Sequence, residues 1–123
     1  YSGSRGLGDV YKRQVEDRHA ILFDDIIDTG GTIAAASRAL IERGAKSVSV
    51  AATHGIFSDE SVEKLKDTPI EEIVVTDTLK QNGNIEKIGN VNILSVSSII
   101  ATALTSIFAD DSVSAIFMGE NVL

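Results

Sequence analysis

Residues 23–32 read Phe23-Asp24-Asp25-Ile26-Ile27-Asp28-Thr29-Gly30-Gly31-Thr32. The two glycines allow positive φ angles and a close approach of the backbone to a ligand. A helical pattern begins at Thr32, so successive N–H groups at its start form an anion-binding nest, which the positive end of the helix dipole strengthens. The hydroxyls of Thr29 and Thr32 add donors. The segment therefore predicts a phosphate site at Thr29–Thr32.

Three carboxylates accompany this loop, at Asp24, Asp25 and Asp28. Carboxylates accept hydrogen bonds from sugar hydroxyls, as the acidic residue of a dinucleotide site does with ribose. They also help to hold hydrated Mg²⁺, which prefers one or two carboxylates together with substrate phosphates. The combination predicts a sugar phosphate with Mg²⁺ nearby, and it makes Asp24 and Asp25 candidates for indirect Mg²⁺ contacts. The alternative interpretation is an Asp-rich turn that caps a helix, with its acids in solvent.

The flanking sequence alternates strand and helix patterns. The apolar run Ala20–Phe23 is typical of a strand buried on both faces of a parallel sheet, and the two acids after it would end that strand. Lys80–Gly89 is polar and contains the turn signal Asn82-Gly83. Further strands are expected at 47–53, 72–76 and 92–95, with Ser112–Phe117 as a last short strand or tail. Helices are expected from Thr32 to a stop at Gly44, from the N-cap Ser58 to Lys66, and over Ser97–Phe108.

This alternation predicts an α/β fold with three layers, a mostly parallel sheet flanked by helices. Ligands of such sheets bind beyond the carboxyl ends of the strands. That rule selects three loops as the binding edge: Asp24–Thr32, Thr53–Ser58 and Thr76–Gln81.

Composition excludes several classes of protein. The 123 residues include 11 basic and 18 acidic side chains, a net charge of −7, which argues against general nucleic-acid binding. Cysteine is absent, so a disulfide scaffold and a thiolate metal site are excluded. The longest apolar run is far shorter than the ~20 residues that span a bilayer, and no secretory signal pattern is found. We expect a cytoplasmic protein with no membrane partner.

Residues 1–14 differ from the rest of the chain. They carry three basic residues against Asp9, whereas residues 15–123 hold 8 basic and 17 acidic residues. The segment from Leu7 to Gln14 looks like a translated cloning adaptor, and such segments are excluded from fold reasoning. The alternative is a flexible native tail. Residues 15–123 are expected to form the domain.

The Asp-Asp-Ile-Ile-Asp-Thr-Gly-Gly-Thr string resembles the phosphoribosyl-pyrophosphate loop of the type I phosphoribosyltransferase fold, in the form found in ribose-phosphate pyrophosphokinases. The resemblance covers Val15–Leu123, roughly the last third of a family chain, so it implies an incomplete phosphoribosyltransferase-like domain. Five further segments agree in order with that family: Arg18–Leu22, Arg43–Ala45, Thr53–Ser58, Val75–Thr78 and Ser112–Phe117.

The resemblance implies a reaction. The family transfers the β,γ-pyrophosphoryl group of ATP to the 1-hydroxyl of ribose 5-phosphate, with Mg²⁺, giving phosphoribosyl pyrophosphate and AMP. By resemblance, Asp24 and Asp28 bind the ribose 2- and 3-hydroxyls with Asp25 beside them, and the 5-phosphate lies at Thr29, Gly30, Gly31 and Thr32. Most of the ATP site and the catalytic Lys and Arg belong to upstream sequence, so no catalytic residue is expected here.

The resemblance also implies regulation and assembly. The family forms homo-oligomers and has an allosteric site for phosphate or ADP. By resemblance, Ser112 and Ser114 offer hydroxyls to phosphate and Phe117 faces the nucleotide base. The alternative for this segment is a short edge strand with alternating faces.

Other interpretations remain open at this stage. A salvage phosphoribosyltransferase would share the loop and use phosphoribosyl pyrophosphate as donor, and a synthetase-associated subunit would bind without turnover. A response-regulator receiver is mimicked by Thr76-Asp77 and Lys80, but it has no use for the glycine nest. A Rossmann unit lacks its Gly-x-Gly-x-x-Gly motif. His54 is expected to be a hydrogen-bonded structural histidine, and His19 a surface residue.

Overall fold

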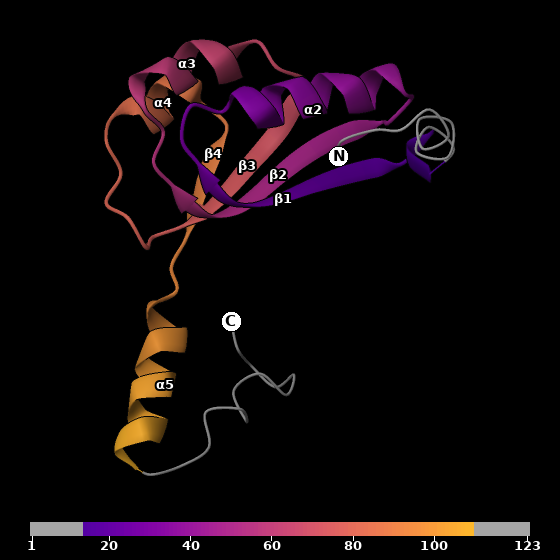
Figure 1. Ribbon diagram of the computed structural model, residues 1–123. Helices are drawn as coiled ribbons and strands as arrows, with labels where there is room; N and C mark the ends of the chain where they lie inside the picture. The colour runs from indigo at the N-terminus through magenta and orange to yellow at the C-terminus, as the bar shows by residue number, and fades with distance from the viewer. Residues whose placement is uncertain (1–13, 110–123) are drawn as a thin grey trace. The chain divides into compact units, whose positions relative to one another are not determined.

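The computed structural model describes residues 14–109, and its ordered core is a parallel sheet (Figure 1). The strands are β1 (His19–Ile27), β2 (Ser47–Gly55), β3 (Ile70–Thr76) and β4 (Val91–Leu94), arranged in the order β1-β2-β3-β4. The helices are α2 (Gly31–Glu42), α3 (Asp59–Lys66), α4 (Asn84–Ile88) and α5 (Ser97–Phe108). The predicted α/β class with a parallel sheet is confirmed.

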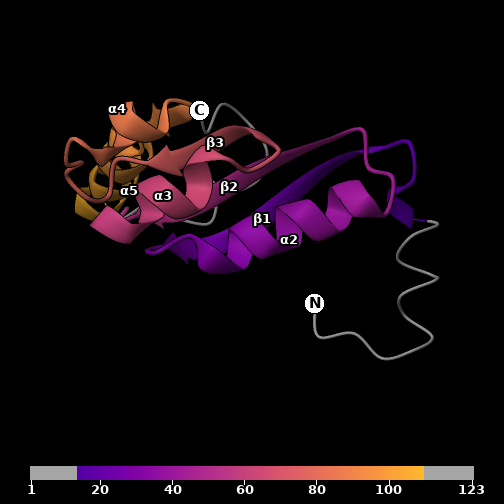
Figure 2. The same ribbon diagram turned by 90° about the horizontal axis from the view of Figure 1, so that it is seen from above.

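The chain divides into two compact units, with the boundary between Ile93 and Leu94. In the first unit, α2, α3 and α4 lie over the same face of the sheet (Figures 1 and 2). The core fills the space between these helices and the sheet, because one face of each strand and one stripe of each helix are apolar. It consists of Ile27, Ile33, Ala34, Val50, Ala52, Phe57, Leu65, Ile70, Ile73, Val75 and Ile88.

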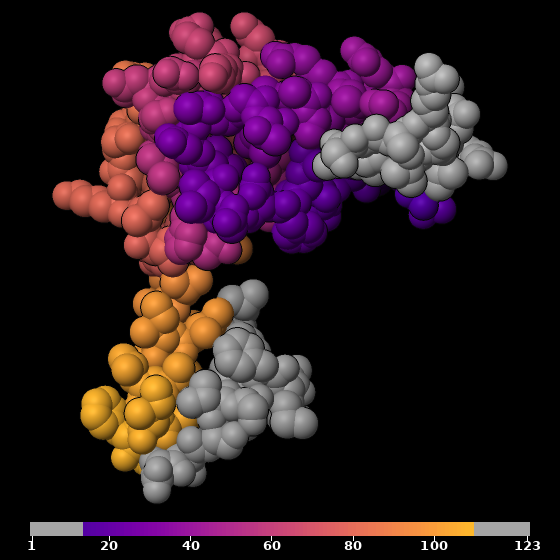
Figure 3. All heavy atoms as spheres, in the orientation of Figure 1, coloured from indigo at the N-terminus to yellow at the C-terminus, as the bar shows by residue number. Residues whose placement is uncertain are grey.

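The opposite face of β1 is uncovered in this unit. Ile21 is 59% exposed and Phe23 is 80% exposed, whereas Ala20 and Leu22 pack beside the core. The prediction that Ala20–Phe23 is buried on both faces is therefore wrong within the described residues. Between residues 14 and 93, helices cover only one face of the sheet. Figure 3 shows β1 and α2 at the surface of this unit.

Strand β1 is also longer than predicted. Its parallel pairing with β2 continues through Asp24↔Ala52 to Ile27↔Gly55. The first two carboxylates of the loop segment therefore lie within the strand instead of ending it.

Helix α2 begins at Gly31, one residue before the predicted start, and Gly44 ends it with a φ of +94°, as predicted. Ser58 precedes α3 but makes no side-chain capping bond. Helix α4 lies inside the polar segment 80–89, where only a turn was predicted.

Helix α5 spans Ser97–Phe108, the predicted bounds. None of its residues is buried, and Ile99 and Ala103 are half-buried. Between residues 14 and 109, no helix has both the length and the apolar composition required to cross a bilayer.

Candidate functional site

The loop between β1 and α2 is held in place by the loop between β2 and α3. The backbone N–H of Ile56 donates to the Ile27 carbonyl at 2.8 Å. Ser58 donates twice to the Asp28 carbonyl, from its N–H at 3.1 Å and from its hydroxyl at 3.2 Å. The predicted cap of α3 thus fixes the candidate loop instead.

Gly30 is the residue at which this loop meets α3. Its φ is +79°, in the left-handed region where a Cβ is unfavourable. A Cβ added there would lie 2.7 Å from Cγ of Leu65, a side chain that is only 2% exposed. Gly31 has no positive φ, and a Cβ there would make ordinary contacts at 3.7–3.8 Å. The conformational need for glycine therefore falls on Gly30.

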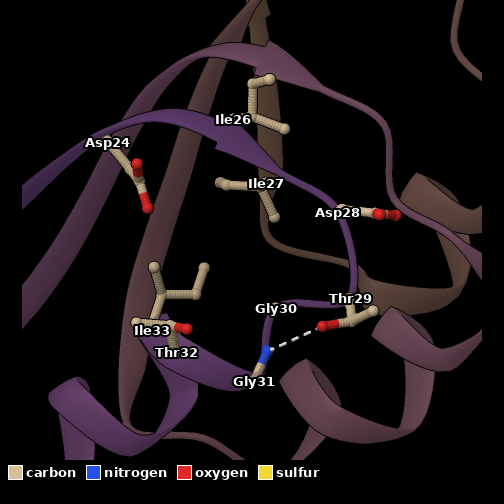
Figure 4. A pocket seen from close by; sticks show the side chains of 9 residues that line it. All are labelled: Asp24, Ile26, Ile27, Asp28, Thr29, Gly30, Gly31, Thr32 and Ile33. Carbon is tan, nitrogen blue, oxygen red and sulfur yellow. Dashed lines mark hydrogen bonds between the residues drawn. The ribbon is translucent and has the colours of Figure 1, made fainter.

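Backbone donors are concentrated at the start of α2. The first helical hydrogen bond runs from the N–H of Ala34 to the carbonyl of Gly30, at 2.9 Å. The N–H groups of Gly31, Thr32 and Ile33 precede it, so they have no carbonyl partner within the helix. The Thr29 hydroxyl accepts a long 3.4 Å bond from Gly31, and no side chain caps the helix (Figure 4). This arrangement fits the predicted anion-binding nest.

A cavity of about 170 Å³ opens beside these donors (Figure 4). The Asp24 and Asp28 side chains do not face each other across it. Six of the predicted site residues line it, and Asp25 does not. The full lining consists of Asp24, Ile26, Ile27, Asp28, Thr29, Gly30, Gly31, Thr32 and Ile33.

Asp25 lies outside the cavity but is linked to it through Asp24. The backbone N–H of Asp25 donates to Asp24 Oδ1 at 2.8 Å, and the N–H of Ile26 donates to Asp25 Oδ1 at 2.9 Å. The pKa of Asp25 is lowered, first by a hydrogen bond with the Asp24 side chain, then by backbone N–H groups and by attraction to His54. Asp25 therefore stays ionised beside Asp24.

Both histidines have structural partners. The Nδ1 atom of His54, on β2, shares a 2.7 Å hydrogen bond with the hydroxyl of Thr78, and His19 pairs with Ser47 at the other end of the sheet. The side-chain amide of Gln81 donates to the Gly55 carbonyl at 2.9 Å, which draws the loop after β3 to the predicted binding edge. Among residues 14–109, no group of three or more His, Cys, Asp or Glu side chains is arranged to hold a metal ion.

One charged residue near the loop was not singled out by the sequence. This residue is Lys64, on α3, whose Nζ lies 3.7 Å from the position of a Cβ on Gly31. No local pattern indicates this, because the contact depends on how α3 packs against the loop. The predicted allosteric residues Ser112, Ser114 and Phe117 lie outside the described residues.

Comparison with known proteins identifies the family. The sequence matches the family described as "Phosphoribosyl synthetase-associated domain" over residues 8–118. The chain belongs to this family. The resemblance inferred from the loop and its flanking segments is thereby confirmed.

Curated relatives of this chain are named as enzymes. Ribose-phosphate pyrophosphokinase of Haemophilus influenzae is 47% identical over 103 residues, covering 84% of this chain and 33% of the relative. The protein of that name from Corynebacterium glutamicum is 43% identical over 117 residues, covering 95% and 34%. The chain thus belongs to a family of enzymes and spans about a third of the length of the curated relatives it matches.

A solved structure agrees with this assignment. Phosphoribosylpyrophosphate synthetase from Mycobacterium smegmatis superposes with a TM-score of 0.71 at 39% sequence identity. The match covers 78% of this chain and 32% of that structure's chain. The fold of the described residues is therefore that of part of a phosphoribosyl synthetase.

Proposed function

We propose that this chain is the ribose-5-phosphate-binding portion of an enzyme that transfers the pyrophosphoryl group of ATP to ribose 5-phosphate, giving phosphoribosyl pyrophosphate and AMP. The observation that carries the proposal is the loop from Asp24 to Thr32, in which carboxylates line one cavity together with the first residues of α2, whose N–H groups have no carbonyl partner within the helix. The names of the relatives support the same chemistry.

The two halves of ribose 5-phosphate need opposite chemistry, and the loop offers both. The 5-phosphate binds at Thr29–Thr32, where N–H donors and the helix dipole, equivalent to roughly +0.5 charge, stabilise an anion. The ribose 2- and 3-hydroxyls donate to the Asp24 and Asp28 carboxylates, which accept hydrogen bonds only. Asp25 acts beside them, through its hydrogen bond with Asp24.

In the reaction, the ribose 1-oxygen forms a bond to the β-phosphorus of ATP. The bond from that phosphorus to the oxygen of the α-phosphate breaks, AMP leaves, and the 1-hydroxyl loses its proton. The residues of this chain hold the acceptor sugar in place, which is the main catalytic demand of phosphoryl-type transfer. Most of the ATP site and the cationic catalytic groups are assigned to the rest of a family chain, and the full-length protein is proposed to form a homo-oligomer.

The described residues fit a Mg²⁺ ion only if the substrate also coordinates it. Asp24 lines the cavity, but the described part of the chain has no cluster of three ligating side chains. Mg²⁺ commonly binds through one or two carboxylates together with waters and substrate phosphates, so Asp24, with Asp25 beside it, suits indirect contacts. When bound, the ion would neutralise charge on the phosphate oxygens.

Calorimetric titration with ribose 5-phosphate tests the proposal. We expect the chain to bind ribose 5-phosphate and not ribose, and Asp28→Asn to weaken binding about tenfold or more, because a charged acceptor is lost. Asp17→Asn is the matched control, since Asp17 is an exposed carboxylate just before the start of β1, at the opposite end of that strand from the loop. Equal affinity in the Asp28 variant and the control would contradict the site.

A second titration separates the salvage alternative. The proposed acceptor site prefers ribose 5-phosphate. A salvage phosphoribosyltransferase would instead prefer phosphoribosyl pyrophosphate together with a purine base, and that preference would overturn the assignment of substrate.

A further inference from the structure

The end of helix α3 lies against the start of helix α2. Leu65 packs against Gly30, as the 2.7 Å approach of Leu65 Cγ to a Cβ built there shows. The preceding residue, Lys64, runs alongside Gly31, with Nζ at 3.7 Å and Cδ at 3.8 Å from the corresponding Cβ position. Because Leu65 is buried, the backbone that carries Lys64 is fixed beside the phosphate loop.

Among residues 14–109, the ammonium group of Lys64 has one ion-pair partner. Its Nζ lies 3.2 Å from Oε2 of Glu60, one turn earlier on the exposed side of α3. Such exposed pairs are worth little, about 0.2–1 kcal/mol. Lys64 can therefore leave Glu60 at small cost when a stronger anion arrives.

A bound phosphate at this loop needs positive charge. The chain has a net charge of −7, and three carboxylates lie within the loop segment itself. A phosphate monoester carries roughly −1.5 to −2 charges at neutral pH, whereas the helix dipole supplies only about half a positive charge. A flexible lysine ammonium beside Gly31 is placed to supply the remainder.

We propose that Lys64 binds the phosphate group of the ligand at Thr29–Thr32 and that Glu60 holds its ammonium group while the loop is empty. This inference rests on the proposed function, because it assigns a further residue to the same phosphate site. Under the same proposal Glu60 weakens binding of the ligand, since its carboxylate competes with the phosphate for Lys64.

The test compares four variants of the full 123-residue chain by calorimetry with ribose 5-phosphate and with inorganic phosphate. Lys64→Gln should lower the affinity for both ligands about three- to tenfold, the range expected for one partly solvated charge facing a phosphate. Lys64→Arg should keep most of the affinity. Lys66→Gln is the matched control, because it removes the same charge two residues along the helix, where the side chain does not face the loop.

Glu60→Gln distinguishes binding from a structural role. If Glu60 competes with the ligand, this variant binds phosphate about twofold more tightly, whereas mere loss of a helix ion pair would leave affinity unchanged or lower. The affinity of Lys64→Gln should also depend less on salt than that of the wild type. Unfolding midpoints of all four variants show whether the fold is retained.

Failure of this inference is distinct from failure of the proposed function. Equal affinities of Lys64→Gln and Lys66→Gln, with binding still lost in Asp28→Asn, would overturn the role of Lys64 and leave the site in place. A wild-type chain that binds neither ribose 5-phosphate nor inorganic phosphate would overturn both.

Discussion

Replacing Gly30 with alanine should destabilise the chain more than any other glycine substitution in the loop. Two costs arise together at this residue. Its φ of +79° is unfavourable for a residue with a Cβ, and the new Cβ would lie 2.7–2.9 Å from three carbon atoms of Leu65. Real Cβ contacts are not that short, so Leu65 or the loop must move.

The magnitude follows from these two costs. A left-handed φ costs an ordinary residue about 1–2 kcal/mol. Overpacking against a buried side chain adds about 1–3 kcal/mol. Gly30→Ala should therefore lower the free energy of unfolding by about 2–5 kcal/mol, and it should also weaken ligand binding, because a shift of the loop misaligns the helix N–H groups.

Urea denaturation of three variants separates the two costs. Gly89 has a φ of +95° and nothing within 4 Å of its Cβ position, so Gly89→Ala carries the backbone cost alone, about 1–2 kcal/mol. Gly31→Ala has neither cost and should be close to neutral. If Gly30→Ala is no more destabilising than Gly89→Ala, the packing of Leu65 against the loop is not what the geometry indicates.

Three further predictions concern the described core and the carboxylates. Phe57→Ala should cost about 3–5 kcal/mol in urea denaturation, because Phe57 is fully buried, whereas Phe23→Ala should lie within about 0.5 kcal/mol of the wild type; similar costs would contradict the uncovered sheet face. Asn84→Ala should cost about 1–3 kcal/mol, since it removes two hydrogen bonds of the buried Asn84 amide, to the Phe57 carbonyl at 2.9 Å and to Asp59 at 3.1 Å, and an unchanged midpoint would show that these bonds are dispensable. The pKa of Asp25 is lower in the folded chain than its usual 3.8, so the stabilising effect of the ionised carboxylate is complete above pH 3.8 and is lost as the pH falls through the folded pKa. Asp25→Asn should therefore make the stability of the chain depend less on pH in this acid range. An unchanged slope of stability against pH would refute the shift.

The sequence predicted those elements that depend on local pattern. Helix α5 has the predicted bounds because the local sequence indicates both its start and the helical spacing of its apolar residues. Helix α4 was missed because its five residues carry little periodicity and are held by tertiary contacts, such as those of Asn84 with Phe57 and Asp59. The exposure of Ile21 and Phe23 depends on which helices cover the sheet, and an apolar run does not specify that.

The candidate site was predictable to a similar extent. A glycine pair before a helix predicts donors for a phosphate wherever it occurs, and the loop from Asp28 to Thr32 has that form. The position of Asp24 and Asp25 inside the strand was not predicted, because it follows from three additional strand residues, Asp24, Ile26 and Ile27, that pair with β2. Lys64 reaches the loop only through the packing of Leu65 on Gly30, a contact between segments more than thirty residues apart.

The site is tested at single residues by following backbone amide resonances of the chain during titration with ribose 5-phosphate. The account predicts that the largest shifts occur at Gly31, Thr32 and Ile33, whose N–H groups precede the first helical hydrogen bond, and that ribose without phosphate leaves these three unchanged. Saturable shifts confined to other parts of the chain, or no shifts at millimolar ribose 5-phosphate, would contradict it.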